Sequence, residues 1–356
     1  MSDFRIDKIT NRDGSTGTQI AGISTFSGTS GMVMPGGTTE YRGGRGRGVI
    51  GGQGWTANIE GLRYIEIATT GNAIDFGDMA VGRNGGAGAA SATRGVFAGG
   101  YDPAPPSPYS AGDQTSIEYT VISSKGGASS FGDLQLKNGG LSGCSDNIRA
   151  LWMGGKWGGA FSGDSEIEYS TIATTGDSST FGYLRAGKEY AENPGCFAST
   201  TRGVVGAGFN TGGGSPWAGY QNTIDYVTIQ TLGNSELFGD LTQARGECAG
   251  LASPTRGVFL GGNSAPAEIT DTIDYITIAT LGNAADFGNL TANRKLMNSV
   301  SSHTRGVVAG GTAPSDVNII EYITIATTGN SVDFGDMPNV GSNGVSCSDC
   351  HGGISQ

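Results

Sequence analysis

The chain has 356 residues, 65 of them glycine, and a formal net charge of −11 at pH 7. This negative balance disfavours nucleic acid and anionic membranes as partners, because both require a basic protein surface. No apolar stretch approaches the roughly 20 residues of a membrane-spanning helix. Five cysteines form an odd set, which argues against a disulfide framework.

The first 44 residues alternate short apolar clusters with glycine, serine and threonine, so they cannot bury a core of their own. We expect this segment to be ordered by lying on another protein or on copies of itself, as in a homo-oligomer. Arg42, Arg45 and Arg47 form a basic cluster just before the first repeat, which fits a solvated linker or a contact with an acidic partner. The N-terminus lacks the apolar run of a signal peptide, which predicts synthesis in the cytoplasm.

A repeat occupies residues 45–356. A tyrosine recurs six times, and a Phe-Gly pair follows each tyrosine at an offset of twelve residues. The tyrosines are Tyr64, Tyr119, Tyr169, Tyr226, Tyr275 and Tyr322, and the phenylalanines are Phe76, Phe131, Phe181, Phe238, Phe287 and Phe334. The offset is constant, whereas the distance between copies varies from 47 to 57 residues. This pattern is typical of rigid modules joined by tolerant loops.

Each copy divides into four strands. In the fifth copy we expect them at the small-residue run 246–250, at 255–262, at 273–278 and around the Phe-Gly pair. The third strand has apolar residues on both faces, which predicts neighbouring sheets stacked against each side. Residues 232–234, Leu-Gly-Asn, and their equivalents fit a tight turn between the third and fourth strands.

Four strands in about 50 residues, repeated six times, predict an all-β protein with the fold of a six-bladed β-propeller. Residues 344–350 align with the small-residue strand that opens each copy, and the first copy is entered near 47–49. A C-terminal strand would therefore complete the first blade and close the ring, which removes two exposed sheet edges.

An apolar strand ending in Gly-Gly, a tyrosine strand, an aromatic residue and then an arginine (Arg83, Arg245 and Arg294) together resemble the kelch repeat. The resemblance covers residues 45–356 and implies four-stranded propeller blades. Phenylalanine stands where kelch repeats usually carry tryptophan, and Asn138 and Gly341 replace the arginine, so the chain resembles a divergent kelch-like family. Kelch propellers serve as enzymes, adaptors and adhesins, so the resemblance implies a fold and no single function.

A second resemblance lies in the N-terminal segment. Residues 4–11 (FRIDKITN), 24–31 (STFSGTSG) and the pair Met34-Pro35 are similar to the N-terminus of tail-fibre and related virion proteins of marine cyanobacterial phages. The resemblance implies that residues 1–44 dock onto other virion proteins and that the protein is located in the virion.

Residues 347–351 fit the C-x-x-C-H motif of covalent haem attachment. The repeat offers another explanation, because Cys144, Cys196, Cys248 and Cys347 align at one repeat position and His351 aligns with His303. We therefore expect small buried strand residues, and no metal or cofactor. Two histidines are too few for a three-histidine zinc site, and no copy carries a distinct cluster of acids.

An arginine on the second strand and an acid on the third recur in four copies. The arginines are Arg94, Arg202, Arg256 and Arg305, and the acids are Glu118, Asp225, Asp274 and Glu321. Adjacent strands would bring each pair together, which predicts a structural salt bridge within the blade.

The loops between the second and third strands vary in length and are rich in aromatic residues. The candidate ligand-contact residues are Trp55, Tyr101, Tyr109, Trp157, Phe161, Phe209, Trp217 and Tyr220. These loops should emerge on one face of the disc, where such rings can stack on sugars or anchor a protein. The alternative is that the rings pack on neighbouring blades.

These features favour a non-enzymatic phage virion structural protein, such as a fibre, a tail appendage or a capsid decoration. Its aromatic loops would contact a host-surface glycan or protein, with no nucleic-acid partner and no membrane insertion. One alternative is a carbohydrate-active or oxidative enzyme on a kelch propeller scaffold, which needs clustered acids or a copper site. Another is an assembly adaptor or spacer that binds only other virion proteins.

Overall fold

The structure, a computed structural model, describes the propeller residues 46–52, 60–102, 112–155, 165–185, 194–210, 219–264 and 268–354. The chain divides into two units, Met1–Arg45 with Gln356, and Gly46–Ser355. In the first unit the description covers only β1 (Thr25–Ser27) and β2 (Gly31–Val33), which pair antiparallel. The rest of the predicted docking segment, 1–44, lies outside the described residues.

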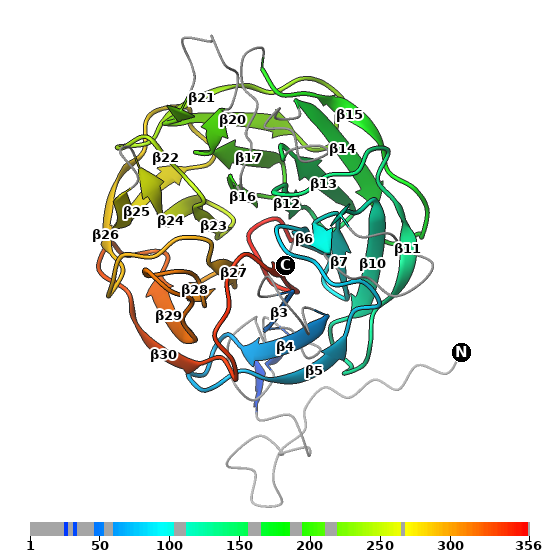
Figure 1. Cartoon of the computed structure of the whole chain (residues 1–356). Helices are drawn as coiled ribbons and strands as arrows, with labels where there is room; N and C mark the ends of the chain where they lie inside the picture. Colours follow the sequence, from blue (N-terminus) through cyan, green and yellow to red (C-terminus); the bar gives the residue numbers. More distant parts are fainter. Residues whose placement is uncertain are drawn as a thin grey trace, which may run out of the picture. The chain divides into compact units, whose positions relative to one another are not determined.

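The second unit is a six-bladed β-propeller, as predicted, with antiparallel blades arranged in a ring (Figure 1). Blade 1 contains, from the centre outward, β31 (Val345–Ser348), β3 (Arg47–Gly51), β4 (Gly61–Glu66) and β5 (Ile74–Asp78). Blade 2 contains β6 (Ala87–Ala90), β7 (Arg94–Ala98), β10 (Ser116–Val121) and β11 (Ser129–Asp133). Blade 3 contains β12 (Ser142–Ser145), β13 (Arg149–Met153), β14 (Glu166–Thr171) and β15 (Ser179–Tyr183).

The other three blades follow the same order. Blade 4 contains β16 (Gly195–Ala198), β17 (Arg202–Gly206), β20 (Thr223–Thr228) and β21 (Glu236–Asp240). Blade 5 contains β22 (Arg245–Gly246), β23 (Ala249–Ala252), β24 (Arg256–Ser264), β25 (Glu268–Thr277) and β26 (Ala285–Asn289). Blade 6 contains β27 (Asn298–Ser301), β28 (Arg305–Ala309), β29 (Ile319–Thr324) and β30 (Val332–Asp336). Short pairs β8 (Tyr101–Asp102) with β9 (Gly112–Asp113), and β18 (Phe209–Asn210) with β19 (Gly219–Tyr220), extend blades 2 and 4.

The inner strand of blade 5 differs from its predicted range, 246–250. It is split into β22 and β23, because Glu247 has a φ of +56° and interrupts the extended backbone between them. The third strand behaves as predicted. Ile273 of β25 packs in a cluster with blade 6 residues, and Ile276 packs with blade 4 residues on the opposite side.

The Phe-Gly pair lies at a β-bulge between the third and fourth strands. In blade 1, Leu62 pairs with Gly77 and Arg63 pairs with Asp75, so Phe76 is the extra residue. The Phe76 ring is buried and meets the Tyr64 ring edge-on, at a centroid distance of 6.1 Å. The same bulge and ring pair occur in all six blades. A bulge fixes the strand register locally, which explains the constant twelve-residue offset.

The glycine of this pair contacts the next blade. A Cβ on Gly77 would lie 2.5 Å from the carbonyl oxygen of Gly126 in blade 2. Residues 232–234, which were predicted to form the turn between the third and fourth strands, instead take part in this contact with the neighbouring blade. The turn lies earlier in the chain, where Thr231 N donates to Thr228 O. Gly233 N donates to Phe181 O of the preceding blade at 3.1 Å. Equivalent bonds occur at all six blade interfaces, so this segment holds neighbouring blades together.

The arginine that opens each second strand also joins two blades. The Arg94 guanidinium lies 4.3 Å from the centre of the Tyr119 ring, and its Nη1 donates to Ile172 O of blade 3 at 2.8 Å. The same stacking and hydrogen bond occur at every interface, and we call this contact the arginine clasp. Its arginines are Arg47, Arg94, Arg149, Arg202, Arg256 and Arg305.

The predicted salt bridges of Arg94, Arg202, Arg256 and Arg305 with Glu118, Asp225, Asp274 and Glu321 are therefore wrong. In register, Arg94 lies opposite Val121, while Glu118 lies opposite Phe97. The acids pair instead with arginines of the loop that enters each blade. These pairs are Arg83–Glu118 (3.1 Å), Arg185–Asp225 (2.9 Å), Arg245–Asp274 (2.8 Å) and Arg294–Glu321 (2.9 Å).

Blades 1 and 3 lack the entering arginine. In blade 1, glycine (Gly341) stands in place of the entering arginine and Arg63 stands in place of the acid. Both partners of the salt bridge are therefore absent from this blade. Arg63 pairs with Asp75 on the outer strand at 3.0 Å. In blade 3 the acid remains, and Glu168 accepts hydrogen bonds from Ser178 Oγ and from Gln135 N. Buried carboxylates therefore keep hydrogen-bond donors where the arginine is absent.

The C-terminal strand closes the ring. β31 pairs with β3, placing Cys347 opposite Val49, and the red C-terminal segment lies at the centre of the ring (Figure 1). Asp349 Oδ1 accepts from Gly46 N at 2.7 Å and Arg47 N at 3.0 Å. In blade 3, Asp146 makes the same pair of bonds within one continuous turn. At the ring closure, two segments that are far apart in the sequence thus make the same hydrogen bonds that a continuous turn makes between the inner and second strands of blade 3.

Candidate functional site

The inner strands line the central channel and carry most of the cysteines. Cys144 and Cys347 occupy the third position of their strands, Cys196 occupies the second, and Cys248 lies just before β23. The predicted common repeat position is therefore wrong for Cys196 and Cys248. None of the five cysteines forms a disulfide, and all five are buried. Burial raises the pKa of the Cys248 thiol to about 11.

The predicted alignment of His351 with His303 is also wrong, by one residue. Ser348 and Ser301 end equivalent inner strands, so the counterpart of His303 is Cys350. This difference of one residue places His351 beyond the end of the repeat. It therefore belongs to a segment whose contacts are not part of the repeated pattern.

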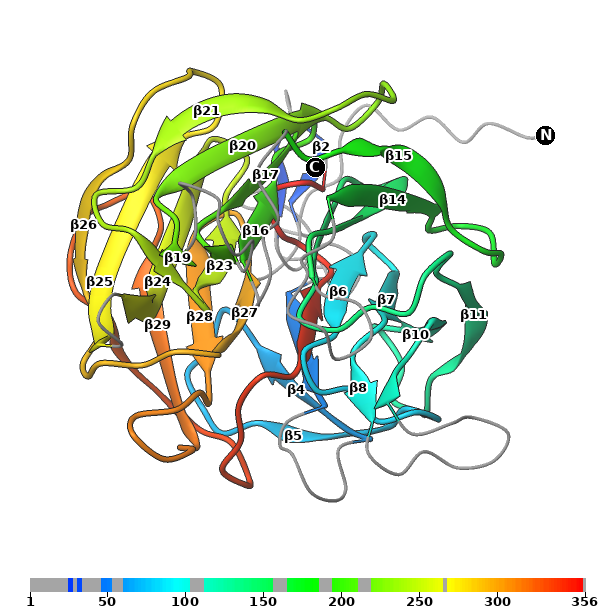
Figure 2. The same cartoon turned by 45° about the horizontal axis from the view of Figure 1, so that its top comes forward.

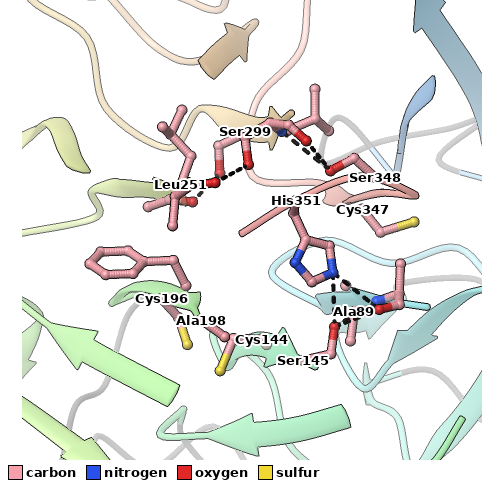
Figure 3. Close-up of a pocket in the computed structure, with 18 of the residues that line it drawn as sticks. Ala89, Cys144, Ser145, Cys196, Ala198, Leu251, Ser299, Cys347, Ser348 and His351 are labelled. Carbon is pink, nitrogen blue, oxygen red and sulfur yellow. Dashed lines mark hydrogen bonds between the residues drawn. The ribbon is translucent and has the colours of Figure 1, made fainter. Parts of the chain in front are cut away.

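Residues 350–354 close one end of the channel. Gly353 N donates to His351 Nδ1 at 3.1 Å, which places the ring proton of a neutral imidazole on Nε2. His351 Nε2 lies 3.1 Å from Ala90 O and 3.2 Å from Ser145 Oγ (Figure 3). Ala90 and Ser145 end the inner strands of blades 2 and 3, so His351 bridges two blades across the channel end.

The same segment reaches the opposite side of the ring. Gly352 N donates to Ala252 O of blade 5 at 3.0 Å. His303 Nε2 of blade 6 lies 3.2 Å from Ile354 O, and the Ile354 side chain is fully buried. The two histidines of the chain thus both hold this segment, which we call the C-terminal plug (residues 350–354).

Two small cavities lie among the described residues that line the channel. A cavity of about 60 Å³ lies next to the C-terminal plug, and one of about 110 Å³ lies toward the other end. Small-molecule pockets usually begin near ~300 Å³. The channel cavities therefore suit a few water molecules better than a sugar or a cofactor.

The other end of the channel opens on the face that carries the loops between second and third strands, here named the loop face. Two of these loops carry the short strands labelled β8 and β19 in Figure 2. The loops entering each blade end on the same face, because they lead into the opposite end of the inner strands from the plug. Variable segments are therefore gathered on one side of the ring.

A ring of left-handed residues surrounds the channel mouth on the loop face. Its described members have φ between +56° and +69° and precede the inner strands by two positions: Gly85, Gly140, Glu247, Leu296 and Asn343. The backbone N–H groups of Gly85, Gly140, Leu296 and Asn343 each donate to the carbonyl oxygen of the equivalent residue in the preceding blade, with N···O distances of 2.6–3.0 Å. Glu247 also forms an ion pair with Lys295 at 2.8 Å. Three non-glycine residues held in this region mark a rigid, strained rim, which the periodicity of the sequence does not reveal.

The structure describes three of the eight candidate aromatic residues. Trp55, Tyr109, Trp157, Phe161 and Trp217 lie outside the described residues. Tyr101 on β8 is 39% exposed. The Phe209 and Tyr220 rings meet edge-on at 5.1 Å, and Asn263 Nδ2 of blade 5 donates to the Tyr220 hydroxyl at 2.6 Å. Tyr220 thus packs between blades, whereas Tyr101 faces solvent in a different blade.

A wider groove lies on the loop face between blades 5 and 6. Its volume is about 600 Å³, and its lining residues are Glu268, Ile269, Ala292, Asn293, Ala313 and Pro314. Apolar side chains, one carboxylate and one amide line it, from three separate segments of the chain. No sequence motif indicated this groove, because its walls come from non-repeating parts of two copies.

Among the residues that the structure describes, no group of three or more His, Cys, Asp or Glu side chains could hold a metal ion. That part of the chain also has no helix with the length and apolarity to span a membrane. No protein-family model matches the chain, and no curated protein matches it.

Proposed function

We propose that this protein is a non-enzymatic structural component of a phage particle whose propeller presents the loop face to a host-surface glycan or protein. In this proposal residues 1–44 dock onto other virion proteins. The observation that carries it is the contrast between the two ends of the ring. One end is closed by the C-terminal plug, and the other gathers the variable loops on a rigid rim. Rigid scaffolds with variable loops are typical of binding surfaces.

Two described features support contact on the loop face. Tyr101 offers an exposed aromatic ring, which stacks well on sugars or packs against a protein. The groove between blades 5 and 6, at about 600 Å³, is within the usual volume range of a ligand site. The enzyme alternative on the same scaffold is less well supported, because His303 and His351 are both engaged in holding the C-terminal plug.

Cryo-electron microscopy of the intact particle would test the location. We expect a six-bladed disc at the tail, the fibres or the capsid surface, with the loop face turned outward. A disc whose loop face is covered by other particle proteins would refute the adhesion role. Absence of the disc from the particle would refute the virion role as well.

Contact with the host is tested by the variant Tyr101→Ala. We expect adsorption of purified protein to host cells to fall at least several-fold. Ile148→Ala is the control, because Ile148 is 66% exposed in the turn between β12 and β13, at the end of the ring opposite the loop face. Equal adsorption by both variants and the unmodified protein would contradict a role of Tyr101 in binding.

A specific observation favours one second function, that of an assembly adaptor. Tyr220, one of the candidate ligand residues, is engaged by Asn263 of the neighbouring blade. If most loop aromatics are used in this way, the loop face is a structural surface for other virion proteins. Binding of the isolated protein to host-free particle components, without binding to host cells, would favour the adaptor.

A further inference from the structure

Serine hydroxyls join neighbouring inner strands at three of the blade interfaces. Each hydroxyl donates to a backbone carbonyl of the preceding inner strand, at 2.7–3.0 Å. The serines are Ser145 in blade 3, Ser299 and Ser301 in blade 6, and Ser346 and Ser348 in blade 1. They stand at the second and fourth positions of their strands, and their side chains point toward the preceding blade.

The interface between blades 3 and 4 lacks these hydroxyls. Its second and fourth positions on β16 are Cys196 and Ala198. By the same strand geometry, the Cys196 side chain points back toward β12 of blade 3. Cys144 on β12 points forward, since its Sγ lies 3.1 Å from where a Cβ on Gly203 of blade 4 would be.

The two thiols therefore face each other across the interface. Both belong to one buried cluster, and Figure 3 shows their sulfur atoms turned toward the same space. Burial, followed by the contact with the Cys144 thiol, raises the pKa of Cys196 well above its usual value. Cys347 provides an internal comparison. It stands at the same position as Cys144, but the residue facing it at the second position of blade 2 is Gly88.

We propose that Cys144 and Cys196 form a modification site, at which a peroxide converts the two thiols into a disulfide between blades 3 and 4. Hydrogen peroxide oxidises one thiolate to a sulfenic acid, and its other oxygen leaves as water. The second thiol attacks that sulfur, the S–S bond forms, and a second water leaves. In total, two thiols and one peroxide give one disulfide and two waters.

The cavity beside the C-terminal plug gives this chemistry its space. Cys144 and Cys196 both line it, and at about 60 Å³ it admits molecules of the size of water or peroxide. The thiolate is the reactive form, so the raised pKa of Cys196 makes the reaction slow at neutral pH. The rate of disulfide formation should therefore rise as the pH is raised from 7 to 9. The product would replace the missing serine link with a covalent one.

The test is to treat the full chain with hydrogen peroxide, then unfold it, alkylate it and map its cysteines by mass spectrometry. We expect a peptide linked through Cys144 and Cys196, a fall from five free thiols to three, and a Tm higher by several degrees. Cys196→Ser should abolish the link and the rise in Tm while remaining folded, since serine fills this position in blades 6 and 1.

Cys347→Ser is the matched control and should respond to peroxide like the unmodified chain. The proposal is overturned if Cys144 and Cys196 are recovered as two alkylated thiols or as two separate sulfinic acids. It is equally overturned if Cys347→Ser abolishes the rise in Tm. Since no host or particle enters this experiment, its outcome is independent of the proposed function.

Discussion

The outer strands of the propeller repeat their contacts at every interface, whereas the inner strands do not. The arginine clasp, the Phe-Gly bulge and the backbone bond to the preceding phenylalanine each occur six times. The inner strands are linked by serines at some interfaces and face each other through Cys144 and Cys196 at another. The comparison teaches that repeated contacts determine the fold, while properties particular to this chain lie around the channel and the loops.

The largest loss of stability should come from adding a methyl group where the outer strands of two blades are in close contact. In Gly182→Ala, the new methyl group would overlap the carbonyl oxygen of Gly233 in the next blade. Two backbones would have to separate, so we expect a loss of about 3 kcal/mol in the free energy of unfolding. Urea denaturation measures it.

Gly233→Ala is the control for this variant, because a Cβ there meets open space. Its free energy of unfolding should stay within about 0.5 kcal/mol of the unmodified protein. Equal destabilisation by the two variants would show that the blades do not pack as closely as the structure has them.

A smaller effect is expected from removing one arginine clasp. Arg202→Ala deletes the stacking on Tyr226 and the 2.7 Å hydrogen bond to Ile278 O of blade 5. Together these contacts should contribute about 2 kcal/mol, which thermal unfolding can detect. Arg63→Ala should cost less than about 0.5 kcal/mol, because its partner Asp75 is largely exposed. If Arg63→Ala is the more damaging change, the clasp is not a principal link between blades.

The same division explains what could be predicted from the sequence. The six-bladed fold followed from the constant offset between tyrosine and Phe-Gly, which the bulge at Phe76 and its equivalents maintains. The pairing of Arg94 with Glu118 was wrong because periodicity shows which strands are neighbours but leaves their register open. A shift of a few residues gives an arginine a new partner. Arg94 instead stacks on the Tyr119 ring and donates a hydrogen bond to a backbone carbonyl of the next blade.

The inner ring was less predictable for a related reason. An alignment of small residues placed Cys248 beside Cys144, although Cys248 lies just before β23 and Cys144 is the third residue of β12. The C-terminal plug has no counterpart in other copies, so no repeat could reveal its contacts. The groove between blades 5 and 6 likewise comes from segments without periodicity.

The smallest expected effect concerns the rim of the channel mouth, and it separates backbone strain from side-chain packing. Leu296 has a φ of +56°, and its N–H donates to Glu247 O. Leu296→Ala and Leu296→Gly both remove the side chain, but only glycine adopts this backbone without strain. We expect Leu296→Gly to be more stable than Leu296→Ala by about 1 kcal/mol. At Ala249, an extended residue of β23, glycine should instead be the less stable by about 0.5–1 kcal/mol. The two differences must have opposite signs if the rim is held in the left-handed conformation in solution, and denaturant midpoints of the four chains decide it. A preference for alanine at both positions would mean that the inner ring relaxes where the outer contacts do not.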